Sequence, residues 1–138
     1  MNKSFSIVAL GLLMLANAHL YGAEPVIDCF KKAMRTFDFK GYEYNVKYST
    51  KLCKNVVSID ETISCVKSSM NTMDFSGYEY NVKYSVALCR STKNAAQTLK
   101  CFKDALREVN FSGYEYNIKY AAELCSAANS CDENDSNN

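Results

Sequence analysis

Cysteine is the residue type with the widest chemical capacity in this chain, because a thiol can form a disulfide, bind a metal or act as a nucleophile. Structural zinc sites and thiol oxidoreductases typically contain two cysteines separated by two residues. No pair of cysteines has that spacing, and His19 is the only histidine. The pattern favours structural disulfides, with no metal and no cofactor. The seven cysteines are Cys29, Cys53, Cys65, Cys89, Cys101, Cys125 and Cys131.

The remaining residues do not form a recognisable catalytic pattern. A cysteine or serine nucleophile needs a positioned base, usually histidine, and His19 lies in or beside a predicted leader segment. Glu43, Glu79 and Glu115 could serve as acids or bases, but they recur every 36 residues. An active site seldom exists three times, so a scaffold role explains these glutamates better. We therefore predict that the protein is not an enzyme.

The tyrosines are the most suggestive residues for binding. Of ten tyrosines, all but Tyr21 lie in a repeated motif. Two interpretations stay open: the rings fill the core with their hydroxyls at its edge, or they form a ladder that binds a protein or glycan. Each can hold for different rings. The candidate binding surface comprises Tyr42, Tyr44, Tyr48, Tyr78, Tyr80, Tyr84, Tyr114, Tyr116 and Tyr120.

Residues 1–23 have the pattern of a secretory signal peptide. Lys3 provides the positive start, an apolar run follows, and cleavage after Ala18 or Ala23 would suit the small residues there. No later apolar run is long enough to cross a bilayer, so no stable membrane insertion is expected after cleavage. We predict a secreted or periplasmic protein, in an oxidising compartment that permits disulfides.

The charge balance argues against nucleic acid as a partner. The chain has 16 basic residues (Lys and Arg) and 15 acidic ones (Asp and Glu), and removal of Lys3 would leave the two signs equal. A neutral protein has no global field that would attract a polyanion.

An internal repeat organises the chain. The string Gly-Tyr-Glu-Tyr-Asn begins at Gly41, Gly77 and Gly113, in steps of 36 residues. Two series of cysteines keep the same step. The predicted units are residues 26–61, 62–97 and 98–133, and the acidic tail at residues 132–138 is predicted to be disordered.

Each unit has the pattern of two helices joined by a short turn. In the first helix the apolar residues cluster within one helical arc, as expected for an amphipathic helix. In the second, Tyr80, Tyr84 and Leu88 lie beside Tyr78 and Val82, giving an apolar face about 200° wide. A face so broad predicts packing against both the partner helix and the next unit.

The starts of the second helices also carry a signal. Ser76 and Glu79 have the spacing of a capping box, and Ser112 and Glu115 repeat it. Lys40 replaces the serine in the first unit, so we expect that helix to fray more easily, by roughly 1 kcal/mol.

The hairpin geometry suggests how the cysteines pair. The two cysteines of a unit lie on either side of the turn and on the apolar faces, so an antiparallel pair of helices brings them to the same end. We favour the three bonds within units over links between neighbouring units, such as Cys53–Cys65 and Cys89–Cys101, because this pairing treats every unit identically. It leaves Cys131 free and able to join two chains. The favoured bonds are Cys29–Cys53, Cys65–Cys89 and Cys101–Cys125.

In unit length and helix count the repeat resembles the helical-hairpin solenoids of the tetratricopeptide and Sel1-like families. The residue patterns of those families are absent, so the resemblance implies no residue roles. The predicted fold is all-α, with three tandem hairpins of about 36 residues, each closed by a disulfide and stacked in a short array.

The predicted function is that of an exported, non-enzymatic repeat protein, acting as a structural or macromolecule-binding module. The alternative is a secreted effector, toxin-like protein or enzyme inhibitor. A repetitive target would favour the first function, because three near-identical units can bind it together.

Overall fold

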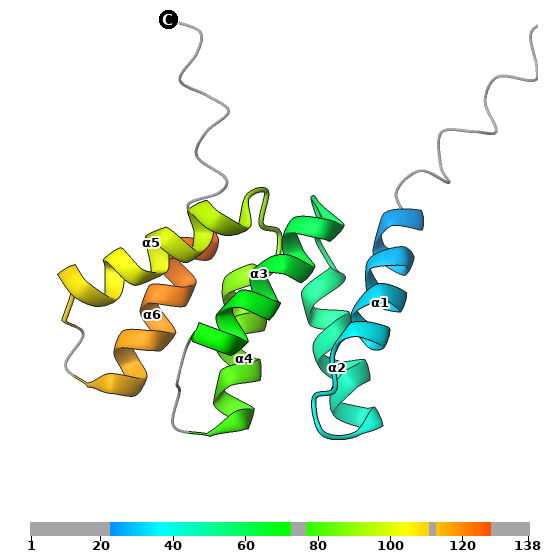
Figure 1. The fold of residues 1–138 in the computed structure, drawn as a ribbon, viewed down its shortest axis with the longest axis horizontal. Coiled ribbons are helices and arrows are strands. Elements are labelled where there is room, and N and C mark those ends of the chain that lie inside the picture. The colour runs from blue at the N-terminus through cyan, green and yellow to red at the C-terminus, as the bar shows by residue number, and fades with distance from the viewer. Residues whose placement is uncertain (1–22, 73–76, 111–112, 128–138) are drawn as a thin grey trace, which may run out of the picture.

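Six helices form the fold seen in the computed structural model, which describes residues 23–72, 77–110 and 113–127 (Figure 1). No strand occurs within those three segments. The all-α fold predicted from the repeat is confirmed. The helices are α1 (Glu24–Thr36), α2 (Tyr42–Cys53), α3 (Ile59–Thr72), α4 (Tyr78–Cys89), α5 (Ala95–Glu108) and α6 (Tyr114–Ala127).

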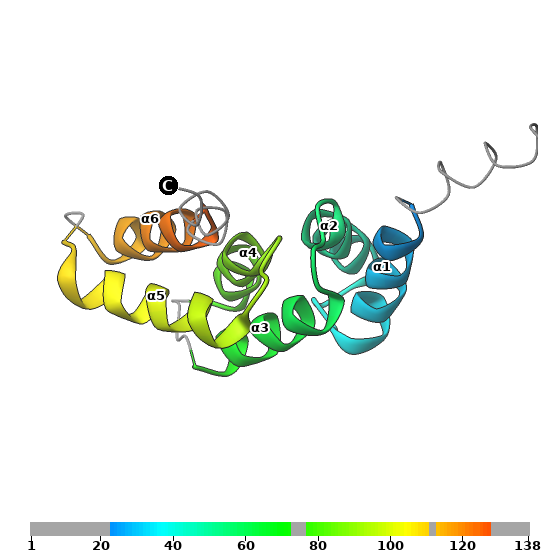
Figure 2. The ribbon, with the colours of Figure 1, turned by 90° about the horizontal axis from the view of Figure 1, so that it is seen from above.

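The helices pair as three successive hairpins, α1 with α2, α3 with α4, and α5 with α6. Seen from above, α1, α3 and α5 follow one another in one row, and α2, α4 and α6 form a second row beside it (Figure 2). Helix α4 packs against α3 within its unit and against both α2 and α6 of the neighbouring units. The prediction that a broad apolar face serves two kinds of contact is therefore confirmed for α4.

One disulfide joins the two helices of each hairpin. The bonds are Cys29–Cys53, Cys65–Cys89 and Cys101–Cys125, with Cα atoms 5.6, 5.6 and 5.7 Å apart and a sequence separation of 24 residues in each. The pairing predicted within units is thus confirmed. Cys131, predicted to be free, lies outside the described residues, as do the predicted signal peptide and the acidic tail.

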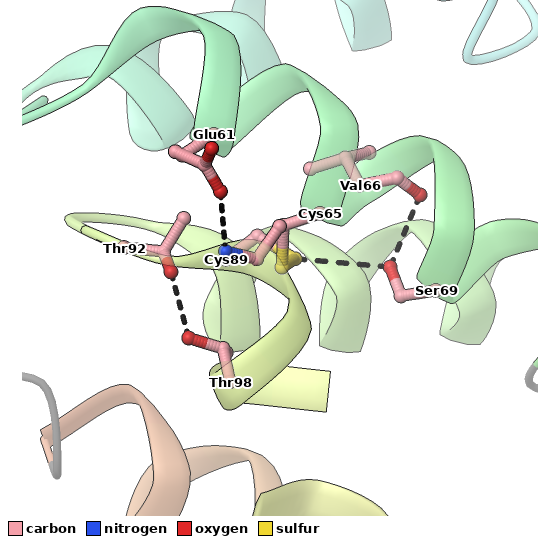
Figure 3. The surroundings of a disulfide bond; sticks show 8 residues. Glu61, Cys65, Val66, Ser69, Cys89, Thr92 and Thr98 are labelled. Atoms are coloured by element: carbon pink, nitrogen blue, oxygen red, sulfur yellow. Dashed lines mark hydrogen bonds between the residues drawn. A yellow bond between two sulfur atoms is a disulfide. The ribbon is translucent and has the colours of Figure 1, made fainter. Parts of the chain in front are cut away.

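The central disulfide lies in a buried and partly polar setting (Figure 3). The Ser69 hydroxyl is 3.8 Å from Cys89 Sγ and donates to the Val66 carbonyl oxygen at 3.1 Å. Close by, the hydroxyls of Thr92 and Thr98 are 2.7 Å apart and share a hydrogen bond. These buried hydroxyls find partners inside the fold, so their burial carries little penalty.

Contacts between units also involve the helix starts. Glu61 of α3 accepts a hydrogen bond at 2.6 Å from the backbone N–H of Ala95, the first residue of α5. Asn94 caps the same helix by accepting from the Gln97 N–H at 2.9 Å. An acidic side chain from one unit thus satisfies a helix N-terminus of the next, where the helix dipole favours negative charge.

Glycine, rather than serine, precedes the second helix of each hairpin. Gly41 and Gly77 occupy the N-cap positions of α2 and α4 with φ of 130° and 127°, and neither helix start has a side-chain cap. The predicted capping position was therefore one residue too early for α4, and Ser76 itself lies outside the described residues. Positive φ explains why glycine is required at this turn.

A side-chain hydrogen bond ties the turn of the first hairpin to α2. Asn45 Oδ1 accepts a hydrogen bond from the Phe39 backbone N–H at 2.5 Å, which ties the turn to the first stretch of α2. Lys40, between them, adopts φ of 62°. The bond joins the turn to the body of α2, while the first N–H groups of the helix have no side-chain cap.

Two observations bear on the compartment. The described part of the chain has three intrachain disulfides, which are typical of proteins that fold in an oxidising extracellular environment. Across the described ranges, no helix combines the length and apolar character needed to span a bilayer.

The hairpin disulfides generate a stability prediction. Replacing both Cys65 and Cys89 by alanine reopens the loop between them, and we expect the free energy of unfolding to fall by roughly 3 kcal/mol, because the unfolded chain regains loop entropy. Urea titration followed by circular dichroism measures this change. Cys131→Ser is the matched control and should leave the unfolding midpoint in place. A double variant as stable as the control would contradict a structural role for the bond.

Candidate binding surface

The repeated tyrosines divide into buried and exposed rings. Tyr48 and Tyr84, at the same position of α2 and α4, are buried, and Tyr78 is half-buried. The interpretation that the rings fill the core therefore holds for the buried rings, and the exposed rings are the ones that a partner could reach. The exposed tyrosines are Tyr42, Tyr44, Tyr80, Tyr114, Tyr116 and Tyr120.

Pairs of tyrosines stack along each second helix. The ring centroids of Tyr44 and Tyr48 are 6.3 Å apart, and the equivalent pairs on α4 and α6 are each separated by 6.2 Å. Tyrosines four residues apart lie on the same face of a helix, which brings the rings together. In each pair the first ring is solvent-exposed.

A lysine lies against each tyrosine pair. Lys47 Nζ is 5.6 and 5.5 Å from the centroids of Tyr44 and Tyr48. Lys83 holds the same place against Tyr80 and Tyr84, and Lys119 Nζ lies 5.1 Å from the Tyr120 ring. At such distances the ammonium group is attracted to the ring face. We name the first tyrosine of each pair together with its lysine the tyrosine–lysine row. Lys119 is half-buried, and the other five residues are exposed. The row comprises Tyr44, Lys47, Tyr80, Lys83, Tyr116 and Lys119.

A groove between the first two units adjoins this row. It encloses about 260 Å³ and lies between α2 with its preceding turn and the start of α4. Lys40 Nζ is 4.5 Å from the Tyr78 ring centroid at this site. The volume lies just below the usual range of small-molecule pockets, so the groove suits one side chain or one sugar ring. Its lining is Phe39, Lys40, Tyr44, Tyr48, Tyr78, Glu79 and Val82.

Two tyrosine hydroxyls bind across unit boundaries. Tyr78 donates to the backbone carbonyl of Asp38 in the preceding unit, and burial, with the nearby Asp38 charge, raises the pKa of Tyr78. Tyr84 donates to Glu115 Oε1 of the following unit at 3.4 Å. Burial is the main cause that raises the pKa of Tyr84, and the Glu115 carboxylate adds to it.

The side chains at this surface offer aromatic faces, hydrogen bonds and positive charge. Phenol rings offer faces for stacking, while their hydroxyls and the lysine ammonium groups offer hydrogen bonds. Glu43, Glu79 and Glu115 are solvent-exposed, and Glu115 is engaged by Tyr84. Within the described segments, no group of three or more His, Cys, Asp or Glu side chains is arranged to hold a metal ion.

Sequence reasoning missed the lysines of the row. Lys47, Lys83 and Lys119 each directly precede the second tyrosine of a pair, and they recur in steps of 36 residues like the tyrosines. The signal was therefore present in the repeat. Lys40 carries no such signal, because the other two units have serine at its position.

The tyrosine contacts predict an alkaline limit to stability. A raised pKa in the folded state means that stabilisation is complete below about pH 10, where unfolded tyrosine is protonated, and is lost as the pH rises through the folded value. Glu115→Gln removes one cause of the raised pKa of Tyr84, so we expect a smaller loss of stability above about pH 10. Urea titrations over this range, with Cys131→Ser as background, measure the effect.

Glu43→Gln provides the control for that prediction. Glu43 has the same repeat position as Glu115, but the described residues contain no earlier unit that would supply a tyrosine to it. The stability of Glu43→Gln above about pH 10 should therefore match that of the parent protein. If Glu115→Gln and Glu43→Gln lost stability equally as the pH rises, the Tyr84–Glu115 contact would not contribute to the stability of the folded state.

Comparison with protein-family models, with curated proteins and with solved structures gave no match. What this surface does must therefore follow from its own geometry.

Proposed function

We propose that the protein is an exported, non-enzymatic binding module, and that the tyrosine–lysine row is the surface with which it binds another macromolecule. The observation that carries the proposal is repetition at an exposed site. Tyr44, Tyr80 and Tyr116 are all exposed, and each has a lysine one turn further along its helix. Large aromatic side chains left in solvent are a cost to a scaffold and are typical of recognition surfaces.

The arrangement favours a target that is itself repetitive, either a protein or a glycan. Three equivalent contacts on one chain act together, because binding at the first raises the effective concentration at the others. Stacked rings beside ammonium groups suit apolar sugar faces, aromatic side chains or backbone carbonyls equally. The secreted effector or inhibitor considered above would need only one such contact.

Binding can be tested with a variant of the row and a matched control. The parent protein, the triple variant Tyr44→Ala, Tyr80→Ala, Tyr116→Ala, and the triple variant Lys31→Ala, Lys67→Ala, Lys103→Ala are immobilised in oxidised form. The three control lysines are exposed, recur every 36 residues and lie on the other row of helices. Each bait is then exposed to fluid from the compartment into which the protein is exported.

We expect the parent protein and the lysine control to retain the same protein or carbohydrate. The tyrosine variant should retain it at least about tenfold less strongly, since exposed aromatic anchors dominate the energetics of such surfaces. Circular dichroism establishes that all three baits are folded. Equal retention by the tyrosine variant would contradict the proposal, as would a parent protein that retains nothing.

A further inference from the structure

Within the described residues, no further unit packs on α6, the last helix of the array. Leu124 of α6 is 54% exposed, whereas the leucines at the same position of α2 and α4, Leu52 and Leu88, are fully buried. Residue type and helix position are the same in all three. Leu52 and Leu88 each have a following unit and Leu124 has none within the described residues, which accounts for the difference. We call Tyr116, Tyr120 and Leu124 the C-terminal end face.

Tyr120 follows the same rule. It is 40% exposed, against 5% for both Tyr48 and Tyr84, its equivalents in the first two units. Tyr84 reaches Glu115 of the unit that follows it, and the described residues hold no unit beyond α6 that would place a glutamate at that repeat position. The C-terminal end face is therefore a third copy of the surface with which the first and second units each contact the unit that follows.

The first unit exposes the complementary surface. Ile27 is 50% exposed, while its equivalent Ile63 is 4% exposed. Thr50 is also exposed, whereas the residues at its position in α4 and α6, Val86 and Ala122, are buried. An apolar depression of about 280 Å³ lies here, and we call its lining the N-terminal end face: Val26, Ile27, Phe30, Thr50, Cys53 and Lys54.

We propose that the C-terminal end face of one molecule docks on the N-terminal end face of a second copy, so that chains join head to tail in the register of the internal unit boundaries. The internal boundaries are the evidence for this occupant, because they join the same repeat positions. The contact of Tyr84 with Glu115 has its counterpart at the new boundary in Tyr120 and Glu43 of the second copy. Solenoids that stay single usually carry polar caps on their outer units, and these faces are apolar.

Electrostatics make the new boundary weaker than the internal ones. Lys32 of α1, in the first hairpin, pairs with Asp60 of α3, in the second, but the residues at the equivalent positions across the new boundary are Asp104 and Glu24, which repel. Both positions are at the protein surface, where charge pairs contribute little, so burial of the apolar residues dominates. A head-to-tail contact uses two different surfaces, which leads to an open series of oligomers unless the geometry closes a ring.

Sedimentation velocity on the oxidised protein, with Cys131→Ser to prevent covalent dimers, tests the proposal. We expect the average mass to rise with concentration up to about 1 mM. Leu124→Glu and Ile27→Glu should each weaken association on the order of a hundredfold, since either buries an unpaired carboxylate in the contact. Val57→Glu is the control, because Val57 is comparably exposed at 58% but belongs to neither end face.

Mixing the two blocked variants identifies the polarity of the contact. Leu124→Glu keeps an intact N-terminal end face and Ile27→Glu keeps an intact C-terminal one, so an equimolar mixture should form dimers that do not grow further. Unchanged circular dichroism and melting temperature establish that both variants fold. The proposal is overturned if the parent protein stays monomeric throughout, if either variant associates like the control, or if the mixture forms no dimer.

Discussion

The covalent link across each hairpin is the constraint on which the rest of this structure depends. Two short helices joined by a turn bury too little apolar surface to be stable alone, and a bond that spans 24 residues offsets part of the lost chain entropy. The sulfurs also occupy core positions, since Cys29, Cys65 and Cys89 are fully buried. Each disulfide therefore fixes the spacing of two helices and fills the space between them. The outer faces of the two helices are then available for contacts with neighbouring units and with solvent.

The position of each tyrosine on these outer faces explains why the repeated Gly-Tyr-Glu-Tyr-Asn segment and the tyrosine that follows it contribute rings both to the core and to the surface. Tyr48 and Tyr84 are covered by the unit that follows them, and Tyr84 also binds it through Glu115. The first ring of each stacked pair, as in Tyr80, stays in solvent beside a lysine. On α2 and α4 the exposed rings of the proposed binding row thus stack on rings that are held in the core. The ends of the described array are apolar because its first and last units each have a neighbour on one side only.

Much of the fold could be predicted because the same sequence pattern occurs three times in the chain. Helical periodicity, the Gly-Tyr-Glu-Tyr-Asn motif and the two cysteine series together led to the hairpins and to bonds such as Cys65–Cys89. Local chemistry was less predictable: Ser76 resembled a cap, yet Gly77 holds the N-cap position, because the turn needs a positive φ that sequence spacing does not reveal. Exposure could not be assigned from the motif, since Leu88 and Leu124 occupy the same position of the repeat, yet only Leu88 is covered by a following unit within the described residues.

The disulfide connectivity is the property that tests this account most directly. The oxidised protein can be digested without reduction, under acidic conditions that prevent thiol exchange, and its cross-linked peptides identified by mass spectrometry. The account predicts linked peptides for Cys29 with Cys53, Cys65 with Cys89, and Cys101 with Cys125. A link between neighbouring units, such as Cys53 with Cys65, would contradict it.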